Sequence, residues 1–191
     1  GARDAFSEQM FALVGLGGRH IREATQLDCK RLLPYLGLLS QRAHSAALIE
    51  SVLRYYFKHR HVHIEQWVER TVRITDTQQN RLGEANSTLG LDQVLGHQVA
   101  DCSGKFRVHL QALDWQRFHE FLPDGSGYPQ LCSLVRLTAR DPLEYDLRLA
   151  LARDEIRPLH LGEHNVCRLG WTSWLAHECA DGVLTVAGNA H

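Results

Sequence analysis

The stretch KFRVHLQAL, residues 105–113, decides the fold class of this 191-residue chain. Phe106, Val108 and Leu110 alternate with polar residues, and this period of two predicts a strand with one buried face. Asp114 follows directly and is a favourable N-cap, so we expect a short helix over WQRFHEFLP, ended by Pro123. The strand therefore runs at once into a helix.

The segments after this helix continue the alternation. PQLCSLVRLTAR, residues 129–140, has apolar residues at helical spacing and predicts a second helix. LEYDLRLALA, residues 143–152, alternates leucine and tyrosine with charged residues and predicts another strand, and VLTV (183–186) predicts a short last one. The order strand, two helices, strand predicts an α+β lobe, in which the two strands lie parallel or are joined through another strand.

The residues before this lobe are mainly helical. We expect helices over residues 6–14 and, with a kink or a start at Pro34, over residues 28–40. The clearest helix is HSAALIESVLRYYFK, residues 44–58, which Ser45 can cap. The sequence thus predicts an α+β fold with a helical N-terminal part, residues 1–58, followed by a small mixed α/β part with long loops, residues 59–191.

Two further segments of the mixed part are predicted from pattern. HVHIEQWV, residues 61–68, alternates apolar and polar residues and predicts a strand. Residues 76–89, DTQQNRLGEANSTL, are polar and contain glycine and asparagine, so we expect a long exposed loop. Loops of this length in compact domains often carry function.

The composition excludes several classes of protein. Hydrophobic residues make up 44% and charged residues 23%, with a net charge of −1, which is ordinary globular composition and gives no indication of a nucleic-acid partner. The longest apolar run, LLPYLGLL, is far shorter than the ~20 residues of a membrane span, so no direct membrane insertion is expected. The five cysteines form no C-x-x-C pair, which favours free thiols in a reducing compartment.

One cluster of histidines could bind a metal. On a strand, His59, His61 and His63 would share one face at intervals of roughly 6.5–7 Å, and zinc takes imidazole readily. Glu65 lies on the same face, yet no residue at ligand spacing completes the site. A solvated polar strand face is the favoured interpretation, and a metal-binding protein is the alternative.

No motif for catalysis or for a cofactor is found. Ser173 in GWTSW lacks the second glycine of G-x-S-x-G, and GLGG at residues 15–18 has no phosphate-binding spacing. The carboxylate pairs Asp154/Glu155 and Asp114/Glu120 are of a kind common on surfaces. We therefore predict no enzyme and no cofactor, with a Ser173 hydrolase as a weaker alternative.

The segment RLGWTSWLA, residues 168–176, holds two of the four tryptophans, Trp171 and Trp174. They fit equally well as a plug of the core or as anchors of an interface, where tryptophan is enriched. Gly170 before them suggests a close backbone approach that a side chain would obstruct. The predicted structural or interface anchors are Trp171, Trp174, Leu175, Trp67 and Phe106.

Three segments together resemble a known family. They are LLSQRAHSAALIESVLRYYFKHRHVHIEQWV (38–68), LGLDQVLGHQVADCSGKFRVHL (89–110) and DLRLAL…LHLG…RLGWTSWLA (146–176). In order and spacing they are similar to the TssG (ImpH) baseplate family of bacterial type VI secretion systems, and LGWTSWL is the most specific element. Family members usually carry an additional N-terminal region, so we expect one before Gly1.

The resemblance implies a structural, non-enzymatic role in the baseplate wedge. It implies that the chain joins TssF subunits, docks TssK and shares the wedge with TssE in a hetero-oligomer. It also implies a cytoplasmic location, docked at the inner-membrane secretion complex. We expect at least one of two long connections, residues 76–89 or 154–166, to reach TssK.

Overall fold

The computed structural model describes residues 12, 27–41, 44–139, 141–156, 168–174 and 182–188. Its elements, in chain order, are the 3-10 helix η1 (Cys29–Tyr35), α3 (Leu36–Leu39), α4 (Ala46–Phe57), β1 (Val62–Glu65), β2 (Arg70–Arg73), β3 (Gln98–Asp101), β4 (Lys105–Leu113), α5 (Trp115–Glu120), α6 (Tyr128–Thr138), β5 (Glu144–Leu151), the 3-10 helix η2 (Arg153–Glu155) and β6 (Val183–Ala187). The helix expected over residues 6–14 lies outside the described residues.

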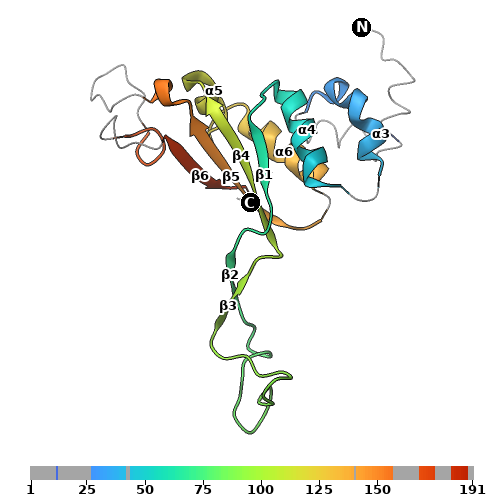
Figure 1. Cartoon of the computed structure of the whole chain (residues 1–191), viewed down its shortest axis with the longest axis vertical. Helices are drawn as coiled ribbons and strands as arrows, with labels where there is room; N and C mark the ends of the chain where they lie inside the picture. The colour runs from blue at the N-terminus through green and yellow to red at the C-terminus, as the bar shows by residue number, and fades with distance from the viewer. Residues whose placement is uncertain are drawn as a thin grey trace.

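A four-stranded sheet with the order β1-β4-β5-β6 forms the body of the molecule (Figure 1). β1 pairs with β4 antiparallel, β4 with β5 parallel, and β5 with β6 antiparallel. Parallel neighbours need a crossover connection, and α5 and α6 supply it between β4 and β5. The predicted α+β fold is confirmed.

Helices α4 and α6 lie against the same face of this sheet (Figure 1). The N-cap predicted at Ser45 is confirmed, because its side chain accepts a hydrogen bond from the Leu48 N–H at 3.3 Å. The apolar faces of the two helices and of the strands form one core cluster. Its fully buried members include Val52, Leu53, Val108, Leu110, Leu131, Leu134, Leu147 and Leu149.

The opposite side of the strands carries charged residues at the alternate positions. Lys105 and Arg107 on β4 both pair with Asp146 on β5, at 2.9 and 3.3 Å. On β1, Glu65 pairs with His109 at 2.8 Å and with Arg107 at 3.4 Å. This alternation fixes the register, since a slip by one residue would turn the charges into the core.

The second sheet has two strands, β2 and β3, which pair antiparallel and project from the body (Figure 1). We call residues 66–104 the arm. β2 and β3 extend the antiparallel pair of β1 and β4 away from the body. Residues 74–97 connect β2 to β3 at the far end. The polar loop expected at residues 76–89 is therefore the end of a longer hairpin whose two strands the sequence pattern did not predict. Among the described residues, no helix is both long and apolar enough to cross a membrane.

Candidate protein–protein interface

The root of the arm is held to the body by hydrogen bonds and ion pairs. The Val68 N–H donates to the Lys105 carbonyl at 3.1 Å and thereby continues the β1/β4 ladder. Arg70 bridges the two sheets: its Nε lies 2.9 Å from Asp101 on β3 and its Nη1 lies 2.8 Å from Glu144 on β5. A side chain at Gly104 would displace this guanidinium from its present position.

Asp101 is the most strongly hydrogen-bonded acid at the root. The Ser103 hydroxyl donates to it at 2.6 Å, the Ser103 N–H at 2.9 Å, and Arg70 Nε at 2.9 Å. These bonds, the two from Ser103 first, lower the pKa of Asp101 to about 2. The carboxylate therefore stays charged at any physiological pH and ties β3 to the turn that leads into β4.

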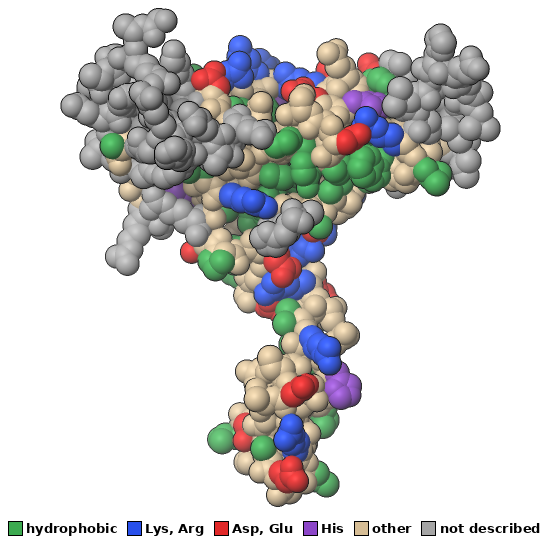
Figure 2. All heavy atoms as spheres, turned by 180° about the vertical axis from the view of Figure 1, so that it is seen from behind, with side chains coloured by type: hydrophobic (Ala, Val, Ile, Leu, Met, Phe, Trp, Pro, Cys, Tyr) green, Lys and Arg blue, Asp and Glu red, His purple; other side chains and the backbone are tan. Residues whose placement is uncertain are grey.

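The far end of the arm has ordered turns but a surface rich in exposed apolar side chains. Asn86 Nδ2 donates to the carbonyls of Thr77 and Gln79, at 2.8 and 3.1 Å. The arm also exposes large apolar side chains, which are Leu82, Leu89, Leu91, Val94, Leu95 and Val99. Leu82 is 90% exposed, and hydrophobic side chains are visible at this end in Figure 2. An exposed cluster of this kind is typical of a surface that another molecule covers.

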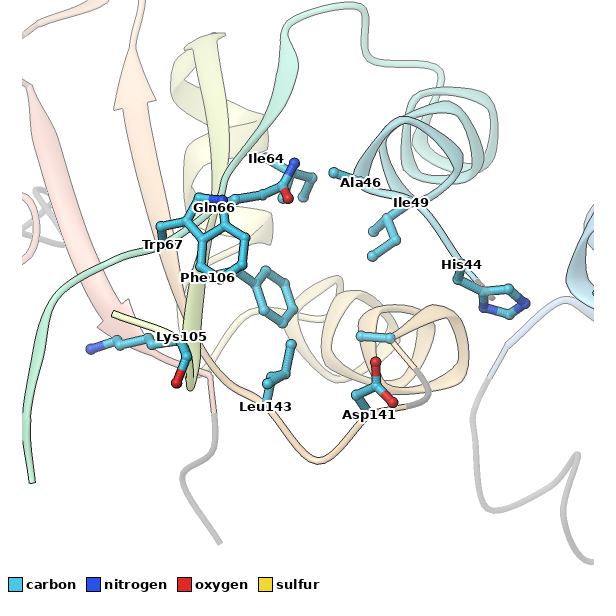
Figure 3. A pocket seen from close by; sticks show the side chains of 12 residues that line it. His44, Ala46, Ile49, Ile64, Gln66, Trp67, Lys105, Phe106, Asp141 and Leu143 are labelled. Carbon is cyan, nitrogen blue, oxygen red and sulfur yellow. The ribbon is translucent and has the colours of Figure 1, made fainter. Parts of the chain in front are cut away.

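A cavity of about 240 Å³ lies where the arm meets the body. Figure 3 shows Phe106, Ile64 and Leu143 pointing into it, with polar groups such as Asp141 at the rim. A cavity of about 150 Å³ holds benzene, so this one can receive a large side chain of a partner. It is smaller than the roughly 300–1,000 Å³ of most small-molecule sites.

Trp67 borders the same cavity, in an unusual conformation. Its φ is 63°, in the left-handed region that a bulky side chain rarely adopts, and it is 69% exposed. Such strain persists where the surroundings impose it, and it is common at functional positions. Of the predicted anchors, the structure thus brings Trp67 and Phe106 together. Trp67 is exposed, whereas Phe106 is buried and stacks on Tyr145 with ring centroids 5.6 Å apart.

The two tryptophans of residues 168–174 lie elsewhere, at the edge of the core. Trp174 is half-buried, with ring centroids 6.3 Å from Trp115 and 5.9 Å from Phe118. Trp171 is also half-buried and packs on the core cluster. This placement favours the core plug over the interface anchor. Leu175 lies outside the described residues.

The close approach expected at Gly170 is wrong. A Cβ at this glycine would meet no atom of the described residues within 4 Å. The glycine is instead favoured by its φ of +80°, which a side chain would strain. The turn is closed by side-chain hydrogen bonds, since the Arg168 N–H donates to Thr172 Oγ1 at 2.9 Å and the Gly170 N–H donates to Ser173 Oγ at 3.1 Å.

The three histidines do not share one strand face, because β1 begins only at Val62. His59 is buried, and its Nε2 lies 2.8 Å from the Gln111 carbonyl oxygen. His63 lies 3.0 Å from Glu50 on α4, and Glu65 instead contacts His109. No group of three or more potential ligands that could hold a metal ion occurs in the described part of the chain.

Asp114 and Ser173, which were considered for catalysis, have structural contacts. Asp114 caps α5, as predicted, by accepting from the Arg117 N–H at 2.7 Å. Ser173 Oγ accepts the hydrogen bond from the Gly170 N–H that closes the turn. Asp154 and Glu155 lie in η2.

Sequence reasoning missed most of the candidate interface. A signal was present in residues 82–99, where leucine and valine recur inside a polar stretch without helical or strand periodicity. The cavity could not be found in this way, since its lining comes from α4, β1, β4 and the segment before β5.

A comparison with protein families gives one match. The sequence model of the family described as "Type VI secretion, TssG" matches residues 1–176. The chain therefore belongs to the TssG family of type VI secretion proteins, and the predicted family is confirmed. None of the curated proteins matches the chain.

Two solved structures share the fold. One is a chain of "Structure of the type VI secretion system TssK-TssF-TssG baseplate subcomplex revealed by cryo-electron microscopy", with a TM-score of 0.74 and 19% identity over 98% of this chain and 79% of that chain. The other is a chain of "The baseplate complex from the type VI secretion system", with a TM-score of 0.60 and 19% identity over 97% of this chain and 53% of that chain.

Proposed function

We propose that this chain is a structural subunit of a type VI secretion baseplate, with no catalytic role, and that it joins TssF and docks TssK. The observation that carries the proposal is the arm, whose exposed leucines have no cover among the described residues. Family membership and the fold shared with a chain of a TssK-TssF-TssG subcomplex support the choice of TssF and TssK as the partners. The proposal includes a cytoplasmic location at the inner-membrane secretion complex and a place for TssE in the same assembly.

Within this function we assign the far end of the arm to TssK. The arm extends away from the body, so a partner can enclose it from several sides (Figure 1). Leu82, Leu89 and Leu95 would each bury most of their side chain on docking. Fully burying a leucine contributes about 1.5–3 kcal/mol, so the three side chains together can contribute several kcal/mol to holding a partner. Of the two connections expected to reach TssK, residues 76–89 belong to this end, and most of residues 154–166 lie outside the described part.

We assign the cavity at the root to a second contact, with Trp67 and Phe106 as its anchors. An exposed tryptophan beside an apolar cavity is typical of an interface hot spot. Trp171 and Trp174 act, in this proposal, on the stability of the fold.

The test is to shorten the arm in the full chain. Replacing residues 75–96 by Asn-Gly leaves β2 and β3 joined by a two-residue turn that suits a hairpin. On co-expression with TssF and TssK, we expect the shortened chain to retain TssF and to lose TssK in affinity purification.

A variant with point substitutions separates the effect of the apolar side chains from the effect of the length of the arm. Changing Leu82, Leu89 and Leu95 to Ser keeps the length of the arm and removes its apolar side chains, and it should also lose TssK. The matched control changes three exposed polar residues of the same region, Gln78, Arg81 and Glu84, to Ser, and should bind as wild type. If both altered arms still purify with TssK, the arm is not the docking element.

A further inference from the structure

A second cavity, at the end of α4 that leads into β1, is lined almost entirely by basic residues. Figure 1 shows this end of α4 on the side of the body away from the arm. The volume of the cavity is about 650 Å³, and its lining is Arg31, Arg54, Tyr55, Lys58, His59 and Arg60. These residues come from η1, from the last turns of α4 and from the turn into β1. Lys and Arg side chains gather along the corresponding edge in Figure 2. We call it the basic pocket.

Helix capping does not account for all of these charges. The carbonyls at the end of α4 are already bound: Arg54 O by the His59 N–H at 3.1 Å, Tyr55 O by the Lys58 N–H at 3.3 Å, and Phe57 O by Arg117 at 2.7 Å. Arg31 Nη1 donates to Tyr56 O at 3.5 Å and so helps to cap α4, whereas the side chains of Lys58 and Arg60 bond to none of these carbonyls.

Two of the basic side chains have acidic partners and two do not. Arg31 pairs with Asp28 at 3.4 Å, and Arg54 pairs with Glu50 at 2.8 Å. Lys58 and Arg60 are exposed, and their side chains form no ion pair or hydrogen bond with any described residue. Burial first, and the nearby Arg117 charge as well, lowers the pKa of His59, which therefore lines the pocket as a neutral ring.

We propose that the basic pocket binds an acidic segment of a partner protein, with carboxylates of that segment at Lys58 and Arg60. Isolated positive charges at the mouth of an open cavity attract anions and set the orientation of a partner. Tyr55, which is exposed and packs against Tyr35 in a tilted arrangement with ring centroids 5.3 Å apart, offers an apolar surface for the rest of the segment.

The chemistry favours carboxylates over a phosphate. Phosphate sites use backbone N–H groups at a helix N-terminus, whereas α4 presents its C-terminal end to this pocket. The negative end of the helix dipole disfavours a doubly charged phosphate more strongly than a singly charged carboxylate. Single carboxylates spread along a peptide can meet the separate charges instead. The inference rests on the pocket and stays independent of the proposed function of the arm.

The test measures binding of a labelled octaglutamate peptide to the purified full chain by fluorescence anisotropy. The variant combines Lys58→Gly with Arg60→Gln. Lys58 has a φ of 50°, so glycine removes its charge at a position that suits glycine, and the fold should be retained. Loss of two exposed ion pairs should weaken binding by about three- to tenfold. Raising the salt concentration from 50 to 500 mM should weaken binding of the peptide to the wild-type chain, because salt screens the charges.

The matched control, Arg73→Gln with Arg81→Gln, removes the same charge from exposed positions on the arm and should leave binding unchanged. Equal loss in both variants, or no octaglutamate binding at all, overturns the proposal. Displacement of the peptide by micromolar pyrophosphate also overturns it, in favour of a phosphate ligand.

A second measurement identifies the occupant. A photo-crosslinking residue in place of Tyr55, in the complex assembled with TssF and TssK, should join a partner peptide rich in Asp and Glu. Crosslinks only to residues 1–26 of the same chain would show that the pocket is filled from within, and would overturn the proposal.

Discussion

The same two chain segments, from β1 into β2 and from β3 into β4, run through the body and the arm. Their apolar side chains are buried in the body and mostly exposed in the arm. In the body, Leu110 on β4 is 0% exposed under the helices. In the arm, Val99 on β3 is 47% exposed, on a strand that leads into β4 within a few residues. The difference lies in what covers the strands. α4 and α6 pack on the strands of the body, whereas no described element packs on the strands of the arm.

The comparison separates two uses of hydrophobic side chains. Those of the body stabilise the fold of the chain by itself. In the arm Val68 and Ile74 are buried, whereas the exposed apolar side chains have little to contribute until another molecule covers them. Core residues should therefore govern unfolding, and arm residues should govern assembly.

The largest effect is expected at Leu110→Ala. Removing a fully buried leucine leaves a cavity, so the free energy of unfolding should fall by about 2–5 kcal/mol. Urea unfolding followed by circular dichroism measures the change. The matched control is Leu82→Ala in the arm, which should stay within about 0.5 kcal/mol of wild type. Equal destabilisation by both would show that the arm is packed like the body.

The next largest effect is expected at Trp174→Ala. The ring packs on Trp115 and Phe118 but is only half-buried, so the loss should be about 2 kcal/mol, below the ~3–5 kcal/mol of a fully buried tryptophan. Thermal unfolding reports it. Ser173→Ala, the neighbouring control, removes one turn hydrogen bond at 3.1 Å and should cost less than about 1 kcal/mol. An enzyme using Ser173 would show the reverse ranking in a secretion-dependent killing assay.

Local patterns predicted the body better than the arm, for a physical reason. The N-caps at Ser45 and Asp114 and the alternation of β4 and β5 are encoded within a few neighbouring residues, so they could be predicted. β2 and β3 have four residues each and no buried apolar face, so their pattern resembles a loop. Only the pairing between them defines the strands.

The site was less predictable than the fold. The exposed anchor Trp67 was predicted, but its left-handed backbone and the cavity beside it depend on residues brought together from distant segments. For Gly170 the sequence predicted a structural requirement for glycine, but the predicted reason was wrong. A glycine required by a positive φ and one required by a close backbone approach look the same in a sequence.

A smaller effect should separate Trp67→Gly from Trp67→Ala. Both variants remove the exposed ring, but only glycine adopts a φ of 63° without strain. The glycine variant should therefore be more stable than the alanine variant by about 1 kcal/mol, measured by urea unfolding. Both should weaken the contact proposed for the root cavity equally. Identical stability of the two would mean that the backbone at Trp67 is not held in the left-handed region.

The smallest effect concerns Asp101, at the joint between arm and body. Its folded-state pKa of about 2 lies below the unfolded value of about 3.9. The stability it contributes is therefore complete above pH ~4 and is lost as the pH falls through about 2. Carbon-13 NMR titration of the carboxyl measures the pKa directly. Ser103→Ala should raise the pKa, because it removes the hydroxyl bond, which is the largest single cause, while the bond from the backbone N–H of residue 103 remains. If Arg70→Gln has the larger effect, the ion pair across the two sheets, and not the turn at Ser103, is what holds the charge at the joint.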